Sequence, residues 1–306
     1  MKKLLKILGL SLALPGLFAM FLGGGNAAAV GHELDASSFM PRVNFLSERD
    51  PSLLAVGDLD GDGKPEMITV NYQSNILSIF RNTGHPGQTT PDSFAPRVDF
   101  PAGPSPASVA VGDLDGDGKL DVVVANDYGA NISVYRNISP PGNISFADPI
   151  HFAAGTHPVS VGIADLDGDG KSDIVVVNAV LGPSTVGVFQ NLTTPGSTEL
   201  SFAAMVEFPT GDYSFNLAVG DLDSDGKPDL AVANEYSTSV SLLRNASGPG
   251  SITPAGPEAL PPRPSSRASI YPWPAGPFLF PWVIWMATAN LRWPSRTMAA
   301  CHCFAT

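Results

Sequence analysis

Four short loops in the sequence carry acidic residues at a fixed spacing. Each follows the pattern Asp-x-Asp-x-Asp-Gly-Lys-x-Asp/Glu, so that carboxylates stand at loop positions 1, 3, 5 and 9. Carboxylates at this density repel one another unless a cation neutralises them. Ca²⁺ is the hard cation that accepts about six to eight oxygen ligands in a flexible geometry. The spacing therefore predicts one calcium site in each loop.

The predicted ligands are the four acidic side chains of each loop and the backbone carbonyl of the lysine at position 7. They are Asp58, Asp60, Asp62, Lys64 and Glu66; Asp113, Asp115, Asp117, Lys119 and Asp121; Asp165, Asp167, Asp169, Lys171 and Asp173; and Asp221, Asp223, Asp225, Lys227 and Asp229. Glycine at position 6 permits the sharp turn that lets alternate side chains face one point. The leucine at position 2 is expected to anchor the loop in the apolar interior.

The acidic loops have two other possible interpretations. An EF-hand loop begins in the same way, but it needs a bidentate Glu at position 12 between two helices. Position 12 is Thr69, Val124, Val176 or Val232 here, and these side chains cannot chelate a metal. The other interpretation is a solvated acidic surface without metal, but turn chemistry alone does not place four acids at the same offsets four times. The loop is therefore predicted to close at position 9 and to join two strands as a hairpin.

The acidic loops belong to a longer repeat. Their first aspartates, Asp58, Asp113, Asp165 and Asp221, are 55, 52 and 56 residues apart. Each repeat has four short β-rich runs separated by Gly, Pro, Asn and Ser. Runs such as the VVVA at 122–125 are continuously apolar, as in strands buried on both faces. The sequence predicts an all-β fold, a β-propeller of four-stranded blades with four full repeats, which are either the whole ring or part of a larger one.

The repeated string DLDGDGKxD, followed by an apolar run and Asn, resembles the FG-GAP or VCBS-type repeats of integrin α-subunit propellers and of many secreted bacterial proteins. The resemblance covers about residues 39–246 and recurs four times. It implies that the loop carboxylates bind calcium and that the repeats form a propeller, typically one with seven blades. Four full repeats are present in this sequence.

The N-terminal residues 1–29 are typical of a secretory signal peptide. Lys2, Lys3 and Lys6 precede an apolar run, and Ala27–Ala29 supply a small-residue cleavage pattern. We therefore expect a secreted or cell-surface protein with no stable membrane span after signal removal. A retained membrane anchor is the alternative. The formal net charge of −12 argues against nucleic acid as a partner.

The C-terminal residues 247–306 differ from the four repeats assigned to 30–246. They hold all four tryptophans, both cysteines and a single acidic residue, Glu258. Trp and Met each have a single codon, so several residues are determined when the gene is translated in the frame that starts at the third base of each codon. In that frame, residues 282–299 are compatible with the sequence GDLDGDGKPELAVANNG. We interpret this tail as a frameshifted fifth repeat. The alternative is a Pro- and Trp-rich terminus that acts as an anchor or interaction segment.

The sequence favours binding over catalysis. It has no Gly-x-Ser-x-Gly elbow, phosphate-cradling loop or zinc spacing, and its five histidines do not recur at equivalent repeat positions. The predicted function is a calcium-binding adhesion module for an extracellular protein or a cell-surface glycan. Two alternatives stay open: a propeller-based extracellular polysaccharide lyase or hydrolase, and a structural matrix protein. Enzymatic activity is left undecided, with the balance against it.

Overall fold

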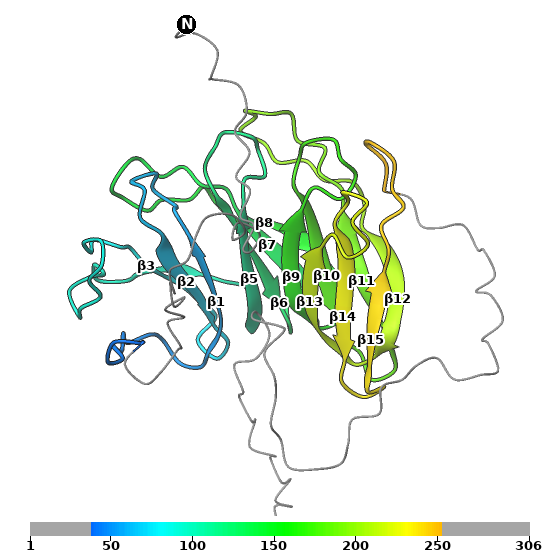
Figure 1. Cartoon of the computed structure of the whole chain (residues 1–306), viewed down its shortest axis with the longest axis horizontal. Coiled ribbons are helices and arrows are strands. Elements are labelled where there is room, and N and C mark those ends of the chain that lie inside the picture. The colour runs from blue at the N-terminus through cyan, green and yellow to red at the C-terminus, as the bar shows by residue number, and fades with distance from the viewer. Residues whose placement is uncertain (1–37, 253–306) are drawn as a thin grey trace, which may run out of the picture. The chain divides into compact units, whose positions relative to one another are not determined.

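The computed structural model describes residues 38–252, shown in Figure 1. The chain divides into two units, 1–42 and 43–306, and every strand lies in the second unit. The predicted signal peptide at 1–29 and the tail beyond residue 252 lie outside the described residues. Within the described part of the chain, no helix is long and apolar enough to cross a membrane.

The fold is all-β, as the sequence predicts. Within residues 38–252, fifteen strands form four antiparallel sheets in chain order, and the sheets are the blades of a four-bladed β-propeller. Blade 1 contains β1 (Pro51–Gly57), β2 (Glu66–Asn71), β3 (Ile76–Phe80) and β4 (Val98–Pro101); blade 2 contains β5 (Pro106–Gly112), β6 (Asp121–Asn126), β7 (Asn131–Tyr135) and β8 (Ile150–Ala153); blade 3 contains β9 (Pro158–Ala164), β10 (Asp173–Asn178), β11 (Pro183–Phe189) and β12 (Val206–Asp212); and blade 4 contains β13 (Ser214–Gly220), β14 (Asp229–Asn234) and β15 (Ser239–Leu243). Three described strands make up the fourth sheet.

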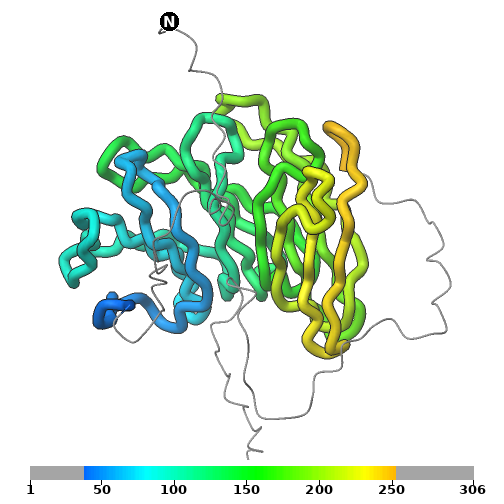
Figure 2. Tube along the Cα trace, in the orientation of Figure 1, coloured from blue at the N-terminus to red at the C-terminus, as the bar shows by residue number. Residues whose placement is uncertain are grey.

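The second strand of each blade is its most buried element. All six residues of β6 and of β10 are buried, because these strands have neighbours on both edges and sheets on both faces. This is the environment that the continuous apolar runs predict. The first strands β1, β5, β9 and β13 are the inner strands, and they lie side by side in this order (Figure 2).

Neighbouring blades are held together by aliphatic side chains at equivalent positions. Ile68, Leu77 and Ile79 of blade 1 are fully buried against Val122 and Val124 of blade 2. Similar clusters join blade 2 to blade 3 and blade 3 to blade 4. Burial of this apolar area is the main stabilising term between blades, at about 25 cal/mol per Å².

The first and last blades each expose one apolar face. Leu54 of β1 is 55 % exposed, whereas Val109 at the equivalent position of β5 is 4 % exposed. On blade 4, Leu242 is 68 % exposed and its equivalent in β7, Val134, is fully buried. Among residues 38–252, no neighbouring blade covers these two faces as it covers the same positions elsewhere in the propeller.

A repeated asparagine also joins consecutive blades. Asn191, which follows the third strand of blade 3, donates from Nδ2 to the carbonyl of Leu114 in blade 2 at 2.8 Å and to that of Ser172 at 2.9 Å. Asn137 and Asn245 make the same pair of bonds one blade earlier and one blade later. The acceptor in the preceding blade is always the leucine at loop position 2, so the asparagine ties each acidic loop to the next blade.

Replacing Asn191 with alanine is expected to lower the free energy of unfolding by about 2–4 kcal/mol, because buried carbonyls of two blades lose their donor. Asn82 is the matched control, since among the described residues its Nδ2 reaches only Pro65 of its own blade. We expect Asn82→Ala to cost about half as much or less. Chemical denaturation in a chelator would compare the two variants, and equal losses would contradict the inter-blade role.

Candidate metal centre

Each acidic loop is a hairpin between an inner strand and the second strand of the same blade. In blade 2, Gly112 at the end of β5 pairs with Asp121 at the start of β6, and the acidic loop closes between them. The other three blades show the same pairing. The hairpin geometry predicted for the loops is confirmed, with position 9 as the first residue of the second strand.

Three carboxylates converge in every loop. In each loop, three carboxylate oxygens from different residues lie within 4.8 Å of one another. The groups are Asp58, Asp60 and Asp62; Asp113, Asp115 and Asp121; Asp165, Asp167 and Asp173; and Asp221, Asp223 and Asp225. Twelve of the sixteen predicted acidic ligands are thus brought together. Glu66, Asp117, Asp169 and Asp229 lie in the same loops but outside these groups, and the full ligand sets stay predictions.

The first carboxylate of the loop organises the backbone around it. Asp113 accepts hydrogen bonds from the backbone N–H groups of Gly116 at 2.7 Å and Gly118 at 2.9 Å. Both glycines have a positive φ, 71° and 85°, which is the conformation that lets the loop fold back on this side chain. The loop is therefore shaped by its own acidic residues, and Asp113 and Asp115 converge with Asp121.

The carboxylate at position 9 is a buried structural acceptor. Asp121 is 1 % exposed and accepts from the backbone N–H of Leu114 at 2.9 Å and of Asn137 at 2.7 Å. Burial raises the pKa of Asp121 to about 7, although the two backbone bonds act in the opposite direction. Burial likewise raises the pKa of Asp173 to about 6. In blade 4 the backbone bonds from Asn245 and Leu222 hold the pKa of Asp229 below its usual value.

Position 3 has a partner that the sequence reasoning missed. Arg136 donates from Nε to Asp115 Oδ2 at 2.6 Å, and Gln190 donates to the equivalent Asp167 at 2.7 Å. Arg81 and Arg244 occupy the same position in blades 1 and 4. The sequence does contain a sign of this partner, since Arg or Gln precedes the asparagine in every repeat. The pairing could not be predicted from it, because this residue is far from the acidic loop along the chain. This partner orients the position-3 carboxylate, and in three of the four loops it also offsets part of the acidic charge.

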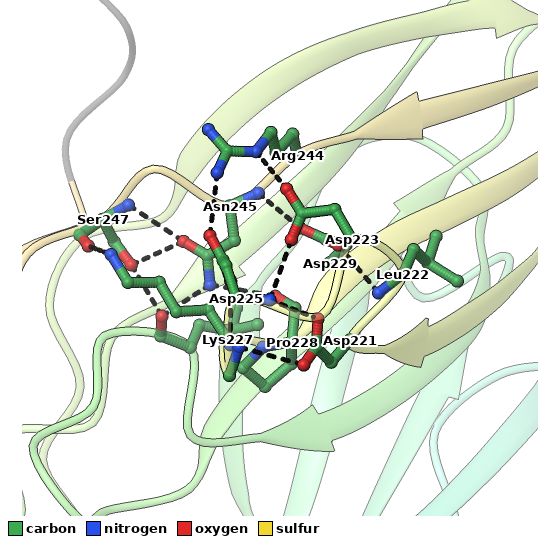
Figure 3. A network of polar contacts seen from close by, with 12 residues as sticks. Asp221, Leu222, Asp223, Asp225, Lys227, Pro228, Asp229, Arg244, Asn245 and Ser247 are labelled. Atoms are coloured by element: carbon green, nitrogen blue, oxygen red, sulfur yellow. Dashed lines mark hydrogen bonds and ion pairs between the residues drawn. The ribbon is translucent and has the colours of Figure 1, made fainter.

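The loop of blade 4 is more open than the other three. Its three converging carboxylates are exposed, and Arg244 contacts both Asp223 and Asp225, as Figure 3 shows. Lys227 donates from Nζ to the carbonyl of Ser247 at 2.6 Å. At position 4 it has Ser224 with φ 64°, where the other loops have a glycine. The fourth centre is thus the most strained and the most accessible to water.

Replacing Ser224 with glycine is expected to raise the free energy of unfolding by about 0.5–1 kcal/mol, because glycine adopts this left-handed conformation without a steric penalty. The reciprocal change, Gly168→Ser in blade 3, places a side chain at φ 72° with no atom within 4 Å to obstruct it. It should lower stability by a similar amount. Urea titration of both variants measures the two changes in the free energy of unfolding. An increase in stability for Gly168→Ser would contradict the explanation by backbone strain at loop position 4.

The arrangement suits a hard divalent cation. Oxygen ligands dominate each centre, the loop backbone is fixed by the same side chains, and adjacent carboxylates need a counter-charge. Within residues 38–252, convergent groups of three or more His, Cys, Asp or Glu side chains occur in these four loops. Calcium ligation is therefore the chemistry for which the loops have the right donors.

Comparison with known proteins points to one repeat family. A model described as FG-GAP-like repeat matches residues 58–124 and 113–176, and a model described as FG-GAP repeat matches 215–253. Human integrin alpha-IIb is 29 % identical over 217 residues, covering 62 % of this chain and 20 % of that protein. Mouse integrin alpha-IIb is 30 % identical over 158 residues, covering 45 % and 15 %. The chain thus spans a fifth or less of the length of these relatives.

Among solved structures, BBS1N in complex with ARL6DN has a TM-score of 0.39 and 17 % identity to this chain. The alignment covers 64 % of this chain and 58 % of that one.

Proposed function

Since the chain belongs to the FG-GAP repeat family, we propose that it is a calcium-stabilised adhesion module that binds an extracellular protein or a cell-surface glycan. The observation that supports the proposal most is the convergence of three carboxylates in each of four equivalent loops. Carboxylates this close together repel one another without a cation, most of all where they are buried as in blades 2 and 3, and one bound cation in each loop would relieve this repulsion.

Calcium would be held by the converging carboxylates, with the position-7 backbone carbonyl as a further candidate. When bound, it supplies the positive charge that the loops lack and fixes the hairpins without disulfides. Residues 1–300 contain no cysteine, so the repeats depend on other devices for rigidity. An affinity of about 10⁻⁴ to 10⁻³ M, the range of extracellular modules, would suit this role.

The relatives and the architecture favour recognition. The integrin alpha-IIb similarity covers 62 % of this chain, and a propeller presents loops from several blades at each end of its strands. The predicted signal peptide would deliver such a module to the cell surface or beyond it. The acidic hairpins occupy one end of the inner strands, which leaves the other end free to carry a ligand site.

A binding assay on the full chain tests the proposal. The chain is immobilised and probed with an array of glycans and with purified extracellular matrix proteins, in calcium and in a chelator. We expect at least one ligand to be retained in calcium and released when calcium is removed. A folded, calcium-loaded chain that retains neither kind of ligand would refute the adhesion role.

A further inference from the structure

Four of the six tyrosines of the chain gather with a histidine at the end of the blades opposite the acidic loops. We call this set the aromatic cluster; it consists of Tyr72, Tyr128, Tyr213, Tyr236 and His157, together with the carboxylate of Asp127. None of these residues was singled out as a ligand site by the sequence. They come from all four blades.

The positions of these residues explain why they meet. His157 and Tyr213 directly precede the inner strands β9 and β13, whose other ends lead into acidic loops. Tyr72, Tyr128 and Tyr236 follow the second strands β2, β6 and β14, which run antiparallel to the inner strands. Both groups therefore lie at the same end of the propeller, away from the candidate metal centres.

Asp127 forms the polar centre of the cluster and links three blades. Its Oδ2 accepts from the hydroxyl of Tyr72 at 2.6 Å, and its Oδ1 lies 2.6 Å from Nδ1 of His157. Burial and the neighbouring Asp127 raise the pKa of Tyr72, so that this hydroxyl stays a donor. Because Asp127 occupies Nδ1 of His157, the Nε2 atom of this half-exposed ring remains for another partner.

The rings surround this centre as two groups. Tyr128 is 6.2 Å from Tyr72 and 5.7 Å from His157 between ring centroids, both in edge-to-face geometry. Tyr213 stacks on Tyr236 at 4.5 Å with an interplanar angle of 13°. The two groups are adjacent because His157 and Tyr213 stand at the same end of the neighbouring inner strands β9 and β13. Burial and the neighbouring Tyr236 raise the pKa of Tyr213. Tyr128 is 70 % exposed and Tyr236 is 59 % exposed, and their rings face water.

The backbone that presents the cluster is shared by all blades, but its side chains are not. The residue before each inner strand has a left-handed conformation: Asp50, Ser105, His157 and Tyr213 have φ between 51° and 63°. The carbonyl oxygen of each accepts a hydrogen bond, at 2.8–3.0 Å, from a backbone N–H that follows the second strand of the same blade. A bulky residue at positive φ is strained by about 1–3 kcal/mol, and such strain concentrates at functional sites. His157 and Tyr213 thus occupy a position where the fold itself gives no reason for a large aromatic side chain.

The chemistry of the cluster fits a neutral sugar chain. Aromatic rings offer flat apolar faces for the C–H surface of a sugar, while Asp127, His157 and tyrosine hydroxyls supply hydrogen-bonding groups. The cluster contains no Lys or Arg to neutralise phosphate, sulfate or carboxylate, and the exposed Asp212 and Glu235 stand nearby in sequence. Because Tyr128 and Tyr236 are exposed, the cluster presents an open surface, which suits a chain. It lies at strand ends and offers no free strand edge for peptide addition.

We propose that the aromatic cluster binds a neutral saccharide chain, with Tyr128 and Tyr236 as stacking platforms and Asp127 and His157 as hydrogen-bonding partners. The inference rests on the proposed function, because it names the ligand class and the surface of the binding module.

The test uses the full chain in calcium on a printed array of neutral and acidic glycans, followed by calorimetric titration of the neutral oligosaccharide that is retained. Tyr128→Ala and Tyr236→Ala are each expected to weaken binding by about tenfold or more, and Tyr128→Phe by no more than about threefold. Ile138→Ala, at an exposed position beside the acidic loops, is the control and should bind as the unaltered chain does. Melting curves of all variants in calcium exclude unfolding as the cause.

Three results would overturn this inference. The first is that Tyr128→Ala and Tyr236→Ala both bind the neutral glycan as tightly as the unaltered chain. The second is that the chain retains only acidic glycans, and the third is that it retains no glycan. Extracellular matrix proteins are tested in parallel on the same chain. If they bind while neutral glycans do not, the saccharide site is wrong and the adhesion module stands; if nothing binds, both fail.

Discussion

Removing calcium is expected to lower the melting temperature of this chain by more than about 10 °C. A ligand that binds only the folded state stabilises it by RT ln(1 + [L]/Kd), so about 10 mM calcium adds about 1.4–2.7 kcal/mol per site at the affinity of extracellular modules. Four loops with converging carboxylates multiply this effect. For a domain of this size each kcal/mol corresponds to about 2–4 °C. Differential scanning calorimetry in calcium chloride and in EDTA measures the shift.

Magnesium is the control for the first prediction. It prefers a near-ideal octahedral shell and keeps several waters, so an equal concentration should restore only a small part of the lost stability. A melting temperature that is the same in calcium and in EDTA would contradict calcium stabilisation. Full restoration by magnesium would argue for nonspecific screening of the acidic loops.

Replacing Asp121 with alanine is expected to lower the free energy of unfolding by about 2–5 kcal/mol even in EDTA. The carboxylate accepts two buried backbone N–H groups, of Leu114 and Asn137, and each unsatisfied donor costs about 1–3 kcal/mol. The loss is therefore structural and adds to any loss of metal binding. Guanidinium titration in the chelator isolates this part.

Asp117→Ala in the same loop is the matched control for Asp121→Ala. Asp117 is exposed, and within residues 38–252 its carboxylate accepts only the backbone N–H of Lys119. We expect a loss below about 1 kcal/mol in EDTA, since an exposed donor can turn to water. Calcium should stabilise the Asp117 variant less than the unaltered chain if position 5 is a ligand. Equal losses for the two variants in EDTA would show that Asp121 has no special structural role.

The fold could be predicted because the same sequence repeat occurs four times. The continuous apolar runs, such as Val122–Ala125, become the buried second strands, and the acidic loops become hairpins between the first two strands. Glycine at loop position 6 marks the turn through a local conformational requirement, and Gly63, Gly118, Gly170 and Gly226 all have positive φ. Residue patterns that recur at a fixed period can be recognised directly in a single sequence.

The tertiary partners were not predictable in the same way. The pairing of Arg136 with Asp115, and the bond from Asn191 to the preceding blade, join residues far apart in the chain. The aromatic cluster is harder still, because its members occupy different repeat positions and meet only when four blades stand side by side. Spacing cannot reveal such a site until the strand order is known.

The frameshifted fifth repeat in 247–306 stays a prediction, since residues beyond 252 lie outside the described part of the chain. The structure adds one relevant observation. Val240 and Leu242 are 64 % and 68 % exposed on blade 4, whereas the equivalent residues of β3, β7 and β11 are buried against a following blade. A further repeat would pack on this face.

Native mass spectrometry of the chain in calcium counts the ions bound by the acidic loops. We expect up to four calcium ions for each folded chain. As the calcium concentration is lowered, the ion in the open loop of blade 4 should be lost first. The three ions in the loops of blades 1, 2 and 3 should stay bound to lower calcium concentrations. A folded chain that carries no calcium, or that takes up magnesium in the same number and at the same concentration, would contradict the claim that these loops are calcium sites.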